Sequence, residues 1–179
     1  MTEPDDTDLI QRCLQGDRKA FEVLLDRYEK PVFNAAFRML NNSEDAKDVT
    51  QTVFLRAYEN LDRFDPTFRF FSWIYRIALN ESINCLQKRN RTEELASEAV
   101  AGTEGPDDAA DSGQRSQRVQ TALMTIKTEY RTVIVLKHFL DCNYVEISQI
   151  LEIPEKKVKS RLYSGRQMLK IVLQDSQLS

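Results

Sequence analysis

Residues 143–170, NYVEISQILEIPEKKVKSRLYSGRQMLK, are typical of one helix, a tight turn and a second helix rich in positive charge. We expect the first helix over residues 144–151, where apolar residues mostly follow helical spacing. Pro154 ends that helix and can begin the next, because its fixed φ suits a first helical turn. One face of the second helix is apolar, with Val158, Leu162, Leu169 and Val172. The other carries six cations within fifteen residues: Lys156, Lys157, Lys159, Arg161, Arg166 and Lys170.

A helix that lies in a DNA groove needs one apolar face and one cationic face, after a short turn of this kind. The charge run by itself also fits an ordinary solvated helix surface. The remainder of the chain must therefore decide between a DNA-binding helix and a solvated one.

The composition predicts an all-helical folded protein. The chain has 179 residues, of which 41% are hydrophobic and 30% charged, and only five glycines and five prolines. No apolar run approaches the length of a membrane span, so we expect no membrane insertion. The acidic start, MTEPDDTDLI, lacks a signal-peptide core, and we expect a cytoplasmic protein.

Cysteine and histidine usage gives no sign of a metal site or a disulfide framework. Cys13, Cys85 and Cys142 are far apart, and no local feature marks any of them as redox-reactive. His138 and Cys142 are four residues apart, but a closed zinc site needs four ligands. We therefore expect no metal and no cofactor.

Charge divides the chain into two domains and a linker. Residues 92–114 carry seven acidic and no basic side chains, whereas residues 115–179 carry 11 basic and six acidic ones. We expect an N-terminal domain over residues 6–91, a flexible acidic linker over 92–115 and a C-terminal domain over 116–175. An acidic protein can in this way still carry a basic DNA-facing module.

Each domain is expected to be a small helical bundle. The N-terminal helices are predicted near residues 7–16, 17–40, 43–61 and 71–89. Thr7 and Ser43 are the expected N-caps. Pro31 should bend or interrupt the second helix. Helices near residues 119–126 and 129–140 should precede the helix-turn-helix pair.

Aromatic and basic side chains alternate in the segment 63–91. Six aromatic residues fall within residues 64–75, with arginines between them and more cations after them. This combination suits single-stranded nucleic acid, because bases can stack on the rings while cations hold phosphates. Alternatively, most of these rings belong to the core. We assign Phe54, Trp73, Ile74 and Ile77 to the core, and expect Phe68 and Arg69 to be exposed.

The predicted helix 43–61 has a different character. Asp45, Asp48, Gln51 and Arg56 lie among its apolar positions, a pattern that fits a protein-docking face. No catalytic motif accompanies it: there is no phosphate-binding glycine loop, no HExxH and no serine on a nucleophile elbow. We therefore do not expect an enzyme.

With these features, the chain resembles a bacterial sigma factor of the sigma-70 family, in the extracytoplasmic-function (ECF) group. DAKDVTQTVFLRAYENLDRFDPTFRFFSWIYRIALNESINCLQKRNR resembles the family's region 2, and TEYRTVIVLKHFLDCNYVEISQILEIPEKKVKSRLYSGRQML resembles its region 4. The resemblance covers nearly the whole chain, with the two motifs in the family's order. It implies a protein that binds core RNA polymerase and directs it to promoters.

The resemblance also implies roles for particular residues. A helix with Asp45, Asp48, Gln51 and Phe54 would dock on the clamp coiled coil of the largest polymerase subunit. The −10 promoter element would be engaged by Asp65, Phe68, Arg69, Phe71, Arg76 and Asn80, with Lys88, Arg89 and Arg91 on backbone phosphates. There the strands separate, and a flipped base would enter a pocket beside the loop. In the −35 major groove, Lys159, Ser160 and Tyr163 would face bases, and Lys157, Arg161 and Arg166 would contact phosphates.

Further partners follow from the same resemblance: the flap of the second-largest polymerase subunit, promoter DNA and an anti-sigma factor. The acidic linker would thread the polymerase's RNA channel. Some positions depart from the family pattern. Lys156 and Lys157 replace the frequent Gly-Thr after the turn, Ser164 and Gly165 replace Arg-Ala, and Thr52 replaces a frequent acidic residue. A glycine inside a helix costs about 1 kcal/mol relative to alanine.

Two rival interpretations stay open from the sequence. An ordinary helix-turn-helix regulator would bind duplex DNA without polymerase, but it leaves the aromatic and basic segment 63–91 unexplained. A protein-binding adaptor with a degenerate DNA helix is the second; alanine at Lys159 and Arg161 would then leave its activity intact.

Overall fold

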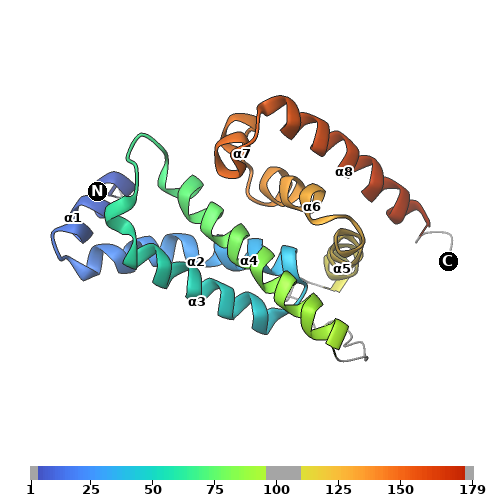
Figure 1. Cartoon of the computed structure of the whole chain (residues 1–179), viewed down its shortest axis with the longest axis horizontal. Coiled ribbons are helices and arrows are strands. Elements are labelled where there is room, and N and C mark those ends of the chain that lie inside the picture. The colour runs from blue at the N-terminus through green and yellow to red at the C-terminus, as the bar shows by residue number, and fades with distance from the viewer. Residues whose placement is uncertain (1–3, 96–109, 176–179) are drawn as a thin grey trace.

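The computed structural model describes residues 4–95 and 110–175, which form helices joined by short turns and contain no strand (Figure 1). The all-helical fold class is confirmed. The N-terminal part contains α1 (Asp6–Leu14), α2 (Arg18–Leu40), α3 (Ser43–Glu59), the 3-10 turn η1 (Leu61–Arg63) and α4 (Phe70–Leu95). The C-terminal part contains α5 (Ala110–Thr125), α6 (Thr128–Ile134), the π-helical turn η2 (Val135–Phe139), α7 (Tyr144–Leu151) and α8 (Glu155–Asp175).

Helices α2, α3 and α4 pack against one another, and α1 closes one end of α2. Their shared core is built from the apolar stripe of each helix, represented by Leu24, Val32, Val53 and Ile74, all fully buried. Trp73 and Ile77 are partly buried and pack against this core, and Phe54 lies within it. The assignment of these side chains to the core is therefore confirmed.

Two expected N-caps in this part were wrong. Helix α1 begins at Asp6, with Asp5 at the N-cap position, so Thr7 lies inside the helix. Helix α3 is capped by Asn42, whose side chain accepts a hydrogen bond from the Asp45 amide at 2.9 Å, and Ser43 is already the first helical residue. Helix α2 continues through Pro31 without interruption. Proline removes one backbone hydrogen bond, but buried Tyr28 and Val32 on either side hold the helix against the core.

The C-terminal helix-turn-helix begins and ends where the sequence predicts. Asn143 and Glu146 form a reciprocal capping box at the start of α7. Glu152 takes a left-handed conformation (φ 53°) at the end of α7, and the Ser148 hydroxyl donates to the Ile153 carbonyl at 2.6 Å across the turn. The backbone oxygen of Pro154 then accepts from the Lys157 amide, so the proline opens α8 as expected.

Helices extend into both ends of the segment 92–115, which was predicted to be linker. Helix α4 runs to Leu95 and α5 begins at Ala110. Thr92 and Glu93 lie inside α4, where no glycine or proline occurs to stop the helix, and the Thr92 hydroxyl donates back to the Lys88 carbonyl at 3.0 Å. The middle of the predicted linker, residues 96–109, lies outside the described residues.

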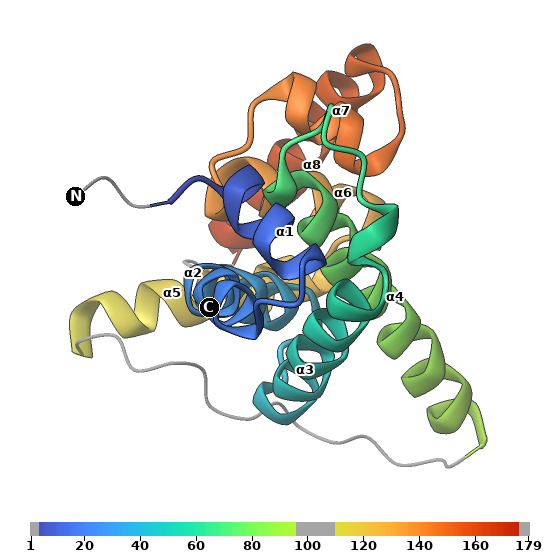
Figure 2. The same ribbon diagram turned by 90° about the vertical axis from the view of Figure 1, so that its left-hand side faces the viewer.

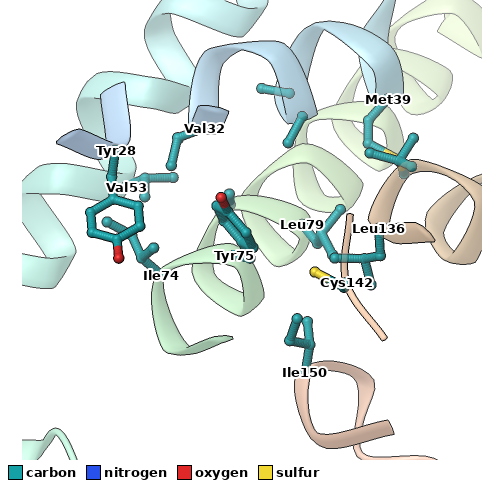
Figure 3. Packing of buried hydrophobic residues seen from close by; sticks show 14 of the residues in the cluster. Tyr28, Val32, Met39, Val53, Ile74, Tyr75, Leu79, Leu136, Cys142 and Ile150 are labelled. Atoms are coloured by element: carbon teal, nitrogen blue, oxygen red, sulfur yellow. The ribbon is translucent and has the colours of Figure 1, made fainter. Parts of the chain in front are cut away.

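The two parts share one continuous core. Helix α4 packs against α7, and α2 packs against α5, α6 and η2. Both views of the ribbon place α7 beside the first turns of α4 (Figures 1 and 2). Leu79 of α4 lies next to Leu136, Cys142 and Ile150 of the C-terminal part (Figure 3). The domains expected to be separate units on a flexible tether are thus closed against each other here.

Candidate nucleic-acid and polymerase interfaces

Helix α8 presents a cationic face to solvent and an apolar face to α6. Val158, Leu162 and Gly165 are buried on the apolar side. Five of the six residues predicted to contact −35 DNA lie on the exposed side or its edges, and Tyr163 is 68% exposed. These five are Lys157, Lys159, Ser160, Tyr163 and Arg166.

Arg161, the sixth predicted −35 residue, points elsewhere. Its side chain is only 20% exposed and forms an ion pair with Glu129 of α6 at 2.9 Å. Its Nε atom is buried without a hydrogen-bond partner. Arg161 lies three residues after buried Val158 and four before buried Gly165, so it shares the side of α8 that faces α6. In this arrangement it holds α8 against α6 and does not face outward like its neighbours.

Tyr144 is a site residue that the sequence did not single out. The ammonium groups of Lys137 and Lys159 each lie 5.5 Å from the centroid of its ring. Lys159 has no acidic partner within residues 4–95 and 110–175. The ring therefore provides the contact that orients Lys159 on the exposed edge of α8.

Arg166 is oriented by the single histidine of the chain. Its Nε atom donates to Nε2 of His138 at 3.2 Å. Partial burial, together with the positive charges of Arg166 and Lys137, lowers the pKa of His138 below its ordinary value. A neutral imidazole is required here, because Nε2 can accept only when it carries no proton.

Gly165 is unfavourable for helix formation, but it has a role in the packing of α8 against α6. A Cβ at this position would lie 2.8 Å from Cδ1 of Ile134 and 3.3 Å from Cβ of Tyr130. Glycine therefore allows α8 to lie close against α6. The departure from the family's usual alanine is compensated by this close approach.

The loop that precedes α4 presents an aromatic and a basic side chain to solvent. Phe68 is 46% exposed and the Arg69 side chain is 75% exposed, as the sequence predicted. The Asp65 carboxylate accepts hydrogen bonds from the backbone and hydroxyl of Thr67, which lower the pKa of Asp65 and fix the loop. Phe71 is only partly accessible, because it packs at 5.8 Å against the Tyr75 ring.

Arg76 lies at the interface between the two domains. Its guanidinium donates to the backbone oxygens of Gln149 (2.6 Å) and Ile150 (3.1 Å) and to the Glu152 carboxylate (3.1 Å). Asn80, one turn along α4, is exposed beside a cleft of about 360 Å³ that Arg76 and Arg161 also line. The predicted −10 surface is thus partly covered by α7.

The cations at the basic end of α4 differ in the partners that they have among the described residues. Lys88 and Arg91 are exposed. Arg89 is bound within the protein: it lies 3.6 Å from both Asp45 and Glu93 and donates to the Leu40 carbonyl. Sequence spacing did not reveal this link, because Asp45 and Arg89 are on different helices.

The exposed face of α3 contains acidic, amide and apolar side chains. Asp48 and Gln51 are exposed and Asp45 is half-buried, in keeping with the predicted docking surface. Phe54 is 6% exposed and cannot itself form much of that surface. Leu55, 58% exposed, and Tyr58 continue the exposed strip, and helical spacing from Asp48 and Gln51 could have identified them.

The described residues contain no cluster of histidine, cysteine and carboxylate side chains that could hold a metal ion. Burial raises the pKa of Cys13 and Cys85, and raises that of Cys142 to about 12. None of the helices within residues 4–95 and 110–175 is both long and apolar enough to span a membrane.

Comparison with known proteins agrees with this architecture. Residues 24–92 match the family model of sigma-70 region 2, and residues 116–169 match that of sigma-70 region 4. The chain therefore belongs to the sigma-70 family. The ECF RNA polymerase sigma factor SigW of Bacillus subtilis (strain 168) is 37% identical over 93% of this chain and 95% of its own length. The ECF RNA polymerase sigma-E factor of Escherichia coli (strain K12) is 30% identical over 90% of each. The chain is an ECF sigma factor, a protein that directs transcription initiation.

Solved structures resemble the whole chain. CnrH, in its complex with the cytosolic domain of CnrY, superposes with a TM-score of 0.73 at 26% identity, over 96% of this chain and 97% of CnrH. The sigma factor RpoE, in its complex with the anti-sigma factor NepR from Bartonella quintana, has a TM-score of 0.76 over 87% of this chain and 98% of RpoE. At 20% identity the second likeness concerns the fold alone.

Proposed function

We propose that this sigma factor binds core RNA polymerase through the exposed strip of α3, Asp48, Gln51, Leu55 and Tyr58, with Asp45 at its edge. The clamp coiled coil of the largest polymerase subunit is the partner for this strip, and the flap of the second-largest subunit contacts the C-terminal domain. An exposed leucine and tyrosine between acidic and amide groups suit such a helix-on-helix interface.

The C-terminal domain then reads the −35 element. Lys159, Ser160 and Tyr163 of α8 face base edges in the major groove, while Lys157 and Arg166 contact phosphates. Arg161 is assigned to positioning α8, because its ion pair with Glu129 turns it away from the exposed face. Ser164 stands where the family often has arginine, so the base or phosphate contact of that arginine is missing here.

The N-terminal domain engages the −10 element as single-stranded DNA. Phe68 and Arg69 of the exposed loop, which Asp65 fixes, would hold an unstacked base, with Phe71 behind them. Arg76 and Asn80 lie further along α4. The phosphates of the DNA backbone are contacted by Lys88, Arg89 and Arg91. The chain contributes no catalytic group to RNA synthesis; the polymerase supplies the chemistry.

The observation that carries this proposal is the presence, on one chain of the sigma-70 family, of an exposed aromatic and basic loop and an exposed cationic recognition helix. The test is transcription from a random promoter library by core polymerase, with and without the protein. Transcripts that need the protein and share two upstream elements are expected. Phe68→Ala should abolish selection of the downstream element, and Lys159→Ala should relax selection of the upstream one. Binding to duplex DNA without any effect on polymerase would instead identify an ordinary helix-turn-helix regulator.

An anti-sigma factor is the expected regulator of such a protein in the cytoplasm. Two solved structures support this expectation: RpoE, which shares the fold, is bound to the anti-sigma factor NepR, and CnrH, which resembles the present chain over nearly its whole length, is bound to the cytosolic domain of CnrY. Purification of the chain from its own cells, followed by mass spectrometry of bound proteins, identifies the candidate. An anti-sigma factor should then prevent the chain from binding core polymerase in a competition assay.

A further inference from the structure

Arg76 closes the end of a helix that belongs to the other domain. The last carbonyl groups of any α-helix lack partners within the helix. In α7, the Ser148 oxygen accepts from the Ile153 amide, and the next two carbonyls in sequence both accept from Arg76. The positive guanidinium also lies at the negative end of the α7 dipole and beside the Glu152 carboxylate.

A second contact between the domains has the same character. The carbonyls of Phe37 and Arg38, near the end of α2, accept from the side-chain amide of Gln120 on α5. The next carbonyl, that of Met39, accepts from Arg131 at 2.6 Å. The ends of two helices in different domains are thus completed by side chains of the opposite domain.

Apolar burial accompanies these polar contacts. Leu79 of α4 packs with Leu136, Cys142 and Ile150, and each of these side chains is at most 2% exposed (Figure 3). The neighbouring Tyr75 ring is also buried, and its burial raises its pKa to about 12. Polar and apolar contacts together define a specific surface for α7 on the first turns of α4.

We propose that this surface of α4 has two competing occupants: α7 of the same chain in the closed form, and the −10 strand of the promoter in the open form. The proposal rests on the function proposed above, which requires Arg76 for DNA. Three of the five N–H groups of the Arg76 guanidinium donate to this end of α7, so a DNA strand that uses them must displace α7. When the domains are closed, DNA therefore cannot reach the −10 surface of α4. When DNA is bound to Arg76, α7 cannot occupy its place on α4.

The test removes the contact from the α7 side, so that the DNA-binding residues stay intact. Glu152→Gln deletes the carboxylate that faces Arg76. Glu155→Gln is its matched control, because it removes the same charge three residues away with no contact to α4. Addition of Gln120→Ala weakens the second contact. All variants are made in the full chain.

Two measurements report on opening and on competition separately. Small-angle X-ray scattering should give the unmodified protein a radius of gyration near the value of about 16 Å for one compact unit of this length. Glu152→Gln with Gln120→Ala should increase it. Fluorescence anisotropy with short random-sequence single-stranded DNA should show about 2- to 5-fold tighter binding for Glu152→Gln than for Glu155→Gln, the range expected from loss of one exposed ion pair.

An Arg76→Ala background completes the test, because there Glu152→Gln should no longer improve binding. Equal affinities for the Glu152→Gln and Glu155→Gln proteins would overturn the competition. A large radius of gyration for the unmodified chain would overturn the closed form. A third outcome is that no variant binds single-stranded DNA while the radius of gyration still responds to the substitutions. The proposed function would then have failed and the competition with it, but the closed form of the protein would remain supported.

Discussion

The guanidinium of Arg131 on α6 donates to the backbone oxygen of Met39 on α2 at 2.6 Å, and thereby joins residues 92 positions apart. It also donates to the carbonyls of Leu123, Met124 and Ile126. Burial lowers the pKa of Arg131, and no carboxylate pairs with it among the described residues. A buried charge of this kind is retained only because its hydrogen bonds are satisfied.

Arg131→Met should therefore destabilise the protein strongly. Methionine keeps most of the volume but leaves several buried carbonyls without donors, each costing about 1–3 kcal/mol. We expect a loss of about 3 kcal/mol or more in the free energy of unfolding, measured in urea. Lys170→Met, at an exposed position on α8, is the control and should change it by less than about 0.5 kcal/mol. Similar losses for both variants would contradict the role given to Arg131.

The pKa of His138 provides a probe of α8. It should lie below the ordinary value of about 6.5 in the folded protein, because partial burial and Arg166 both disfavour the imidazolium. The unfolded chain then binds the proton more readily, so this group's contribution to stability is present above about pH 6.5 and is lost as the pH falls toward the folded pKa.

An NMR titration of this single histidine measures its pKa directly. Arg166→Gln removes one of the positive charges and should raise it. The same substitution also removes the donor to Nε2, so the ring should become more mobile. A value unchanged by Arg166→Gln would show that the two side chains do not interact in solution.

Helix propensity and packing act in opposite directions at Gly165. Alanine should gain about 1 kcal/mol from propensity. Its Cβ, however, would lie 2.8 Å from Cδ1 of Ile134, so most of this gain should be lost. Ile134→Val removes that Cδ1 atom. We expect the double substitution to be more stable than the sum of the two single effects, as measured by urea unfolding in a double-mutant cycle. If the two changes in the free energy of unfolding are strictly additive, α6 and α8 can move apart to accommodate the alanine Cβ without a loss of stability.

The Tyr144 ring should help to position Lys159 on DNA. Tyr144→Phe keeps the aromatic face, and should preserve affinity for a duplex that carries the −35 element recovered from the promoter library. Tyr144→Leu removes it and should weaken binding about 2- to 5-fold, which corresponds to a cation–π contact of about 0.5–1 kcal/mol. In a Lys159→Ala background the two variants should bind equally. A persistent difference there would assign Tyr144 a role that does not pass through Lys159.

The sequence predicts most of this fold because each helix carries its own boundary signals. Pro154 and the apolar spacing of residues 144–151 placed α7 and α8, and the aromatic and basic segment placed the loop with Phe68 and Arg69. What the sequence could not reveal has a common physical origin. Arg161, Arg76 and Arg89 were all assigned to DNA from their position along a helix, and each also forms an ion pair with a residue distant in sequence that helical spacing does not reveal. Periodicity specifies the face of a helix, but the neighbour on that face depends on tertiary packing.

Two adjacent residues of α3 allow the effect of a substitution on polymerase binding to be measured apart from its effect on stability, because one is exposed and the other is buried. Leu55 is largely exposed, so Leu55→Ser should leave the free energy of unfolding within about 0.5 kcal/mol of the unmodified value. If the strip docks on core polymerase, the same change should weaken that complex at least about tenfold, because central apolar contacts dominate interface energies. Phe54→Ala, one position earlier, should instead cost about 3–5 kcal/mol of stability, because its ring is buried. Titration of labelled protein with core polymerase, alongside urea unfolding of each variant, distinguishes the two effects. Unchanged binding for Leu55→Ser would remove Leu55 from the docking surface and shift the interface toward Asp48.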